Sequence, residues 1–466
     1  MIEGENNMTR TIDFTEGKPS GVILKFFFPL LLTNTLQQFY NFADTAIVGK
    51  GLGDRALAAV GNMSSLCFLI IGFSMGLANG FSILIAQRFG EKDLPKLRKT
   101  LASSIQLAAI LAAGLTIFSM IFLRPILMML RTDSSIIEDS LAYGYVLFGG
   151  LTATIAYNMS SGILRSLGDS RTPLTAIIIS SILNITMDSL FIFVFKMGVI
   201  SAALATIISQ VISAAVCINR LRKIDFLALS REDMKVDVSM YGVLLKNGIP
   251  MALMNSITAV GCMVVQYHVN GLGVAFTSAY SACSKYLNMF MQPAATAGVT
   301  MSSYTGQNYG AKRFDRIKEG LKVCLGIAAI SYVTLGSAMV LLPRQLASVL
   351  LNGSMEIGYA AQFLPICGVM IIAVDFLFVI RNAVQGMGFP FVPMLSGILE
   401  MVLRMSAIII LVGPLGFKAT ALAEVAAWVG ALAVNTAAFI AVYTRESRKH
   451  SCSDTVITAV QRPKTA

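Results

Sequence analysis

The chain has 466 residues, of which 55% are hydrophobic and only 13% are charged, and its mean hydropathy is +0.72. Soluble domains carry about 25% charged residues, so this composition excludes an ordinary soluble protein. Apolar runs long enough to cross a membrane recur without the alternating pattern of a barrel, which predicts an all-α membrane protein. The net charge of +11 does not indicate nucleic acid, because Lys and Arg gather in particular short loops.

A stripe of polar residues enters the membrane with the first apolar run. Asn34, Gln37, Asn41 and Asp44 are spaced 3, 4 and 3 residues apart, so they share one face of a helix. A carboxylate in the middle of a span costs roughly 2.5 to 3.5 kcal/mol on insertion scales. We therefore expect Asp44 to face a bundle interior or a wet cavity. The alternative is an aspartate that orders the glycine-rich turn at 49–53.

Twelve helical spans can be placed in the chain. Alternate loops then fall on alternate sides, and one side receives 27 Lys and Arg against 7 on the other. This asymmetry puts both termini in the cytoplasm, with the protein in the cell (inner) membrane. The predicted spans are 22–48, 57–84, 100–123, 140–164, 173–196, 199–220, 243–268, 275–304, 319–342, 356–384, 392–413 and 417–443.

The second half of the sequence repeats the first at one constant offset. The matches include 87–90 with 307–310, 51–53 with 271–273, and Gly168 with Gly388. Two six-helix copies insert in the same orientation and are related by an axis along the membrane normal, with a substrate site between them. We therefore predict a polar tail at 1–17, an N-terminal lobe at 18–220, a cytoplasmic linker at 221–242, a C-terminal lobe at 243–443 and a cytoplasmic tail at 444–466.

Motifs for enzyme chemistry or a cofactor are missing. The sequence has no phosphate-binding G-x-x-x-x-G-K-[ST] loop, which argues against ATP use, and only two histidines. Gly72-Phe73-Ser74-Met75-Gly76 matches a hydrolase elbow, yet it lies inside an apolar run. Gly72, Gly76 and Gly80 at four-residue spacing instead favour close packing of helices. The sequence therefore predicts no enzyme and no cofactor.

Further polar residues occur inside the spans of the first half. Asn184 and Asp188 share one face of the fifth span, while Asn158, Tyr143 and Thr206 lie in or beside the fourth and sixth. With Asp44 these groups could hold a proton or a hard cation such as Na⁺, which prefers oxygen ligands. Unrelated hydrogen bonds between helices are an equal alternative.

The second half holds fewer such groups. Asp375 is a carboxylate within the tenth span, and Lys285 is a lone cation within the eighth. Glu400 and Arg404 are four residues apart and predict an ion pair within one helix. Glu424 in the twelfth span is interpreted in the same way, which leaves Asp375 as the functional candidate.

From about residue 18 to 443 the sequence resembles the multidrug and toxic compound extrusion (MATE) family of secondary transporters. The resemblance is carried by 29–49, by 57–61, by 164–169 with Pro173, by Asn184 and Asp188, by 306–311, and by Glu400 with Arg404. It implies twelve helices in two lobes around a central cleft, and export of organic cations driven by inward flow of H⁺ or Na⁺.

The resemblance also implies roles for individual residues. The coupling cation, H⁺ or a Na⁺ ion, would bind Asp44, Asn184 and Asp188, with Asn158, Thr206 and Tyr143 joining the network. A glutamate that some members carry in the seventh helix has no match here. The candidates for the substrate cleft are Gln37, Asn41, Asn255, Thr258, Lys285 and Asp375.

The sequence therefore predicts a secondary antiporter for amphipathic organic cations. Its expected partners are the small-molecule substrate and membrane lipid, with no nucleic acid and no obligate protein. A flippase for lipid-linked saccharides of the same superfamily is the alternative; such proteins are expected to have a more cationic cavity. A membrane-embedded receptor or enzyme is the alternative from another class.

Overall fold

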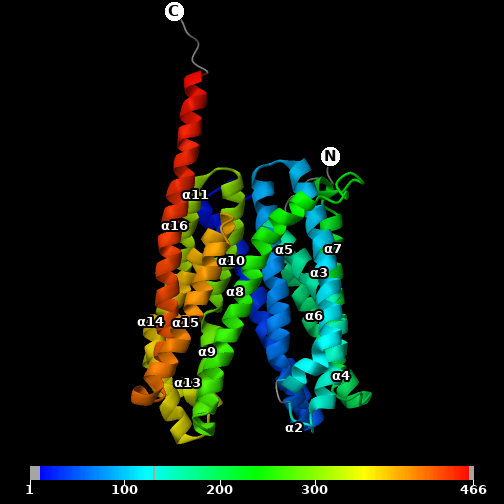
Figure 1. Cartoon of the computed structure of the whole chain (residues 1–466), viewed down its shortest axis with the longest axis vertical. Helices are drawn as coiled ribbons and strands as arrows, with labels where there is room; N and C mark the ends of the chain where they lie inside the picture. Colours follow the sequence, from blue (N-terminus) through cyan, green and yellow to red (C-terminus); the bar gives the residue numbers. More distant parts are fainter. Residues whose placement is uncertain (1–10, 130–131, 461–466) are drawn as a thin grey trace, which may run out of the picture. The chain divides into compact units, whose positions relative to one another are not determined.

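The computed structural model describes residues 11–129 and 132–460, and within these ranges it contains helices and no strand. Figure 1 shows the helices as coloured ribbons. The elements are α2 (Pro19–Gly90), α3 (Leu94–Met129), α4 (Ile137–Gly149), α5 (Leu151–Ser166), α6 (Arg171–Ser189), η1 (Leu190–Val194), α7 (Ile200–Arg222), η2 (Asp225–Leu227), α8 (Val238–Asn270), α9 (Val274–Phe290), α10 (Gln292–Gly310), α11 (Phe314–Ser331), η3 (Tyr332–Gly336), α12 (Ser337–Leu341), α13 (Pro343–Leu350), α14 (Ser354–Gly386), α15 (Phe391–Leu415) and α16 (Lys418–Val460).

Ten helical segments in the described residues are long and apolar enough to cross a membrane. Two of them come from α2, which divides at Gly53 into Pro19–Gly53 and Arg55–Gly90. The other two predicted spans, 140–164 and 275–304, are each broken into two shorter helices. The first breaks at Gly150, between α4 and α5, and the second breaks at Met291, where Pro293 opens α10. Counting each broken span once gives the twelve that the sequence predicts.

Some helix ends differ from the prediction. α16 continues past residue 443 as far as Val460, and the span predicted at 319–342 contains a π-helical turn, η3, between α11 and α12. The short helix α13 lies in a stretch for which the sequence predicted a loop. Pro343 occupies its first turn, where a missing N–H costs nothing.

Contacts between residues divide the chain into two compact units. The first unit holds Leu24–Ala259 and the residues up to Asp13, and the second holds Phe14–Ile23 and everything from Val260 onward. The change from one unit to the other falls inside α8. The lobe boundaries predicted from the sequence stay a prediction, because the compactness of a unit does not fix where a lobe ends.

The backbone repeats itself at the same constant offset as the sequence. Positive φ angles occur in four matched pairs: Gly53 with Gly273, Lys92 with Lys312, Gly168 with Gly388, and Lys196 with Gly416. Hydrogen bonds repeat as well, since Asp169 N–H donates to Leu164 and Phe389 N–H to Val384. Left-handed backbone is uncommon outside glycine, so four agreeing pairs confirm the repeat seen in the sequence.

Glycines bring α2 and α8 together within the first unit. A Cβ atom on Gly76 would meet the backbone of Ala252, and one on Gly80 would meet the backbone of Gly248. The predicted packing role is therefore confirmed for these two glycines. Gly72 differs, because a Cβ there would enter open space. Its carbonyl instead accepts a hydrogen bond of 3.0 Å from Nδ2 of Asn255.

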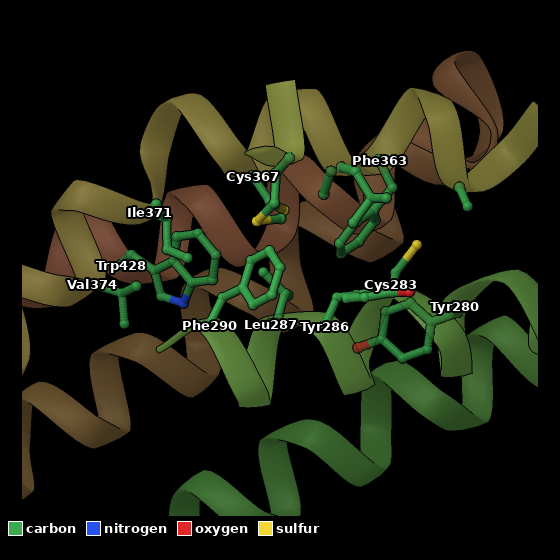
Figure 2. Packing of buried hydrophobic residues seen from close by; sticks show 14 of the residues in the cluster. Tyr280, Cys283, Tyr286, Leu287, Phe290, Phe363, Cys367, Ile371, Val374 and Trp428 are labelled. Atoms are coloured by element: carbon green, nitrogen blue, oxygen red, sulfur yellow. The ribbon is translucent and has the colours of Figure 1, made fainter. Parts of the chain in front are cut away.

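An aromatic cluster forms the core of the second unit, as Figure 2 shows. Tyr280, Tyr286 and Phe290 project from α9, Phe363 from α14, and Trp428 from α16. Each of these side chains is buried. Aromatic rings in such pairs contribute about 0.5–1.5 kcal/mol beyond their buried area, so the cluster locks these three helices to one another.

The segment before α2 is fixed in the second unit by Arg316. Its guanidinium donates to the carbonyls of Phe14, Glu16 and Gly17 at 2.8–3.3 Å. The Phe14 ring is fully buried against Tyr304, with ring centroids 5.6 Å apart. Part of the predicted polar tail 1–17 is therefore packed structure.

Candidate functional site

Two carboxyl groups of the first unit face each other. Asp44 comes from the first half of α2 and Asp188 from the last turn of α6, and their side chains lie within hydrogen-bonding reach of one another. Ionised carboxylates only accept hydrogen bonds, so two of them in contact repel unless a proton or a cation lies between them. This pair is the centre of the candidate site.

Asn184 and Asp188 stand one turn apart on α6, and both are fully buried. Both carboxylate oxygens of Asp188, Oδ1 of Asp44 and both amide atoms of Asn184 have no hydrogen-bond partner among the described residues. Leaving one buried polar group unsatisfied costs about 1–3 kcal/mol. The unpaired oxygens of this cluster fit a site that binds a cation through oxygen ligands.

Two tyrosines and a threonine border the carboxylates. Tyr40 Oη lies 3.5 Å from Thr206 Oγ1 of α7, and Tyr40 is one turn before Asp44 on α2. Tyr143 of α4 is buried, and both carboxylates act electrostatically on it. Thr206 thus contacts Tyr40 one turn from Asp44, and Tyr143 is buried near the pair; their part in cation binding stays a prediction.

Tyr40 is the member of this group that the sequence did not single out. It stands next to Phe39 in an apolar run, so composition favours a lipid-facing ring. Its spacing of four residues from Asp44 was the available signal, because residues i and i+4 share a helix face.

The remaining candidates of the first unit are less closely joined to the site. Asn158 on α5 is half-buried, and its Nδ2 has no hydrogen-bond partner among the described residues. Gln37 is half-buried and Asn41 is exposed on α2. Asn255 and Thr258 of α8 use their side chains locally, on the carbonyls of Gly72 and Met254.

The candidates of the second unit have contrasting environments. Asp375 on α14 is 1% exposed, and neither of its carboxylate oxygens has a hydrogen-bond partner within the described chain. Lys285 on α9 is exposed. Burial without a partner makes Asp375 a functional candidate, and the exposed Lys285 stays a candidate for the substrate cleft because it lies within a predicted span.

Arg404 of the second repeat corresponds to Asn184 of the first, at the same offset that relates Gly168 to Gly388. Its guanidinium contacts Glu400 on α15 at 3.1 Å and Glu424 on α16 at 3.0 Å, and Arg381 on α14 contacts Glu400 at 2.6 Å. The predicted pair of Glu400 and Arg404 is confirmed, and two further charges join it. All four residues are buried, and their formal charges cancel.

Comparison with known proteins identifies the family. The family model described as MatE matches residues 29–190 and 250–423. The chain belongs to the MATE family. MATE proteins are transporters, so the prediction of a non-enzyme is confirmed.

Two MATE relatives come from Bacillus subtilis strain 168. The probable multidrug resistance protein YpnP is 32% identical over 313 residues, covering 66% of this chain and 69% of the relative. The probable multidrug resistance protein YoeA is 31% identical over 306 residues, covering 64% of this chain and 66% of the relative. The chain thus matches about two thirds of the length of these relatives.

A solved structure has the same fold. It is described as the outward-facing conformation of a multidrug resistance MATE family transporter of the MOP superfamily. The TM-score is 0.88 at 22% identity, and the match covers 94% of this chain and 99% of that one. The predicted fold, twelve transmembrane helices in two six-helix lobes, is confirmed by this likeness and by the helix count above.

Proposed function

We propose that this MATE transporter is an antiporter of the cell membrane that exports organic cations in exchange for H⁺ or Na⁺. The observation that carries the proposal is the contact between Asp44 and Asp188, beside Asn184, in which buried oxygens face one another without a donor from the described chain. A proton or a Na⁺ ion satisfies such a set of oxygens.

The proposed coupling depends on whether a cation lies between the two carboxylates. With a cation bound, the two carboxylates attract it and α2 and α6 are held together at the site. When the cation leaves, the carboxylates repel, and the two helices favour a different arrangement. Because α2 and α6 belong to the same unit, ion binding can reshape that unit and so change its affinity for substrate.

The energy available from one ion is sufficient for export. A single charge moving inward through 100 mV releases about 2.3 kcal/mol, but a monovalent organic cation moving outward costs the same amount. A one-for-one exchange is therefore driven by the concentration gradient of the ion, and a tenfold H⁺ or Na⁺ gradient supplies about 1.4 kcal/mol, enough for roughly a tenfold substrate gradient. Neither nucleotide nor other cofactor is needed. The charge asymmetry of the loops supports an orientation with both termini in the cytoplasm.

An organic cation is the substrate class that the second unit supports. Asp375 is buried without a hydrogen-bond partner in the described residues. A buried carboxylate without a donor of its own favours a cationic ligand over an anionic one. Both relatives from Bacillus subtilis are named as probable multidrug resistance proteins, which favours the same class.

The flippase alternative has little support from the charges. That alternative expects unpaired cations for an anionic lipid-linked saccharide. The buried Arg381 and Arg404 are neutralised by Glu400 and Glu424, and of these three cations Lys285 alone has no acidic partner in the described residues.

Accumulation of a fluorescent organic cation in everted membrane vesicles tests the proposal, because the cytoplasmic face of such vesicles lies outside. An imposed pH gradient and an imposed Na⁺ gradient are compared, with intact protein, Asp44→Asn and the control Asp139→Asn, whose partly exposed carboxylate pairs with Arg55. We expect one gradient to drive accumulation, Asp44→Asn to abolish it and Asp139→Asn to leave it unchanged. Export of no tested cation under either gradient would overturn the substrate class.

A further inference from the structure

A groove of about 570 Å³ lies on the first unit, outside the carboxylate site. Its walls come from α3, α5 and the end of α7, which run side by side in Figure 1, and its end is closed by Leu227–Leu229. Ala109, Ile155 and Met159 are typical of the lining. Such a volume is ample for a small molecule or for part of a lipid chain.

The groove opens toward membrane lipid. α3 is a candidate span, and only 17% of its most apolar stretch is buried inside the protein. Ile105 and Ala109, which form one side of the groove, are exposed on this helix. An apolar groove that meets the hydrocarbon region suits a hydrocarbon chain.

Positive charge gathers at one end of the groove. Arg222, the only charged residue among the described lining residues, is exposed in the last turn of α7, and Lys223 follows it. Neither forms an ion pair within the described residues. Arg98 of α3 donates a hydrogen bond of 2.9 Å to the carbonyl of Phe226, which adds a second guanidinium near this end. Asp225 is an exposed acidic residue beside this end, and Asp233 lies near Arg98.

The hydroxyl group of Ser160 in the lining is engaged within the protein. Ser160 donates to the carbonyl of Ala156 at 2.7 Å, within its own helix. The groove therefore offers apolar walls along its length and free positive charge at the end where the α7 span stops. Basic pockets at the ends of transmembrane helices bind anionic lipid headgroups.

We propose that this groove binds an anionic phospholipid. One acyl chain lies between α3 and α5, and the phosphate of the headgroup lies at Arg222, with Lys223 and Arg98 adding to its attraction. In the topology proposed above this end faces the cytoplasmic leaflet, where anionic lipids attract basic residues. The proposal is independent of the coupling ion and of the exported substrate.

Lipid binding to the purified full-length chain in detergent tests this assignment. Phosphatidylglycerol and phosphatidylcholine with the same acyl chains are titrated, and bound lipid is counted by native mass spectrometry. The variants are Arg222→Gln for the charge and Ala109→Phe for the groove. Their controls are Arg344→Gln, another exposed arginine, and Ala113→Phe, an exposed alanine one turn further along α3 that does not line the groove.

The intact chain should bind phosphatidylglycerol more tightly than phosphatidylcholine. Arg222→Gln should weaken phosphatidylglycerol alone by about fivefold, the equivalent of about 1 kcal/mol for a basic residue near the surface. Ala109→Phe should weaken both lipids, and the controls should weaken neither. Equal affinity of the intact chain for the two lipids, or unchanged phosphatidylglycerol binding in both variants, would overturn the proposal.

Discussion

Asn184 in α6 and Arg404 in α15 occupy equivalent positions of the two repeats. The amide of Asn184 stands one turn from Asp188 and has no hydrogen-bond partner among the described residues, whereas the guanidinium of Arg404 contacts Glu400 and Glu424. The second repeat thus carries a permanent cation as part of its own chain. We infer that the first repeat alone exchanges its cation with solution.

Removal of the permanent cation should destabilise the protein. In Arg404→Leu, Glu424 loses its salt bridge, and Glu400 keeps only Arg381. Breaking a buried pair from one side costs about 3–5 kcal/mol. The exposed Arg344 gives a control, Arg344→Leu, with an expected change within about 0.5 kcal/mol. Thermal unfolding in detergent measures both, and equal midpoints for the two variants would contradict the structural role.

A methyl group at Gly168 should be poorly tolerated. This glycine has a φ of +82°, and a Cβ there would meet the carbonyl of Ile12. The left-handed backbone alone costs a side chain about 1–2 kcal/mol. Gly114→Ala is the matched control, because its Cβ enters open space on α3 and alanine favours a helix by about 0.5–1 kcal/mol. Unfolding midpoints should fall for Gly168→Ala and stay level or rise for Gly114→Ala; the reverse order would refute this reading.

Acid should loosen the start of α8. The backbone N–H of Met240 and the side chain of Lys99 hold the pKa of Asp237 below its usual value of 3.8. Because the folded pKa is the lower one, this stabilisation is present above pH about 4 and is lost as the pH falls through the folded pKa. Hydrogen exchange at 238–242, corrected for its intrinsic rate, should be constant from pH 7 to 5 and rise at lower pH.

The variant Asp237→Asn should remove that acid response at 238–242. Asp225→Asn, which changes an exposed carboxylate outside the α8 start, should retain it. If the acid response persists in Asp237→Asn, a different titrating group causes it and the prediction is wrong.

Arg316→Lys should release the segment before α2. The three guanidinium nitrogens of Arg316 donate to the carbonyls of Phe14, Glu16 and Gly17 at once. The single ammonium group of lysine cannot make all three hydrogen bonds. Hydrogen exchange of 14–17 should rise by about tenfold or more, since each lost charged hydrogen bond contributes about 1.5–3 kcal/mol. Arg313→Lys, at an exposed position nearby, should leave this exchange unchanged. Unchanged exchange in Arg316→Lys would contradict this role and leave the segment held by the Phe14 ring and by the hydrogen bonds of Phe14 with Gln307 and Asn308.

The fold could be predicted from the sequence because its signals are long and repeated. Apolar runs gave twelve spans, and the constant offset between the two halves reappears in the φ angles of Lys92 and Lys312. The breaks at Gly150 and Met291 could not be predicted, since both neighbouring segments are helical and the chain only bends between them. The packing of Phe14 depends on Arg316, which lies far along the chain, and no local pattern encodes it.

The candidate site could be predicted in part. Asn184 and Asp188 share a helix face by their spacing, and Asp44 is costly enough in a membrane to demand a partner. Their encounter, however, joins α2 with α6, and spacing within one helix does not specify it. Tyr40 was missed because a tyrosine in an apolar run is expected to place its ring against lipid. Arg381 was missed as a partner of Glu400 because it lies on the preceding helix, and spacing within one helix does not specify a contact between two helices.

The central claim is that the pair of Asp44 and Asp188 carries the coupling ion. The most direct measurement is ion movement in sealed vesicles after addition of a transported organic cation, followed with a pH dye and with a Na⁺ dye, for intact protein, Asp188→Asn and the control Asp139→Asn. We predict counterflow of one ion in the intact protein, its loss in Asp188→Asn and its retention in Asp139→Asn. Counterflow that survives in Asp188→Asn would contradict the account and place the coupling ion elsewhere.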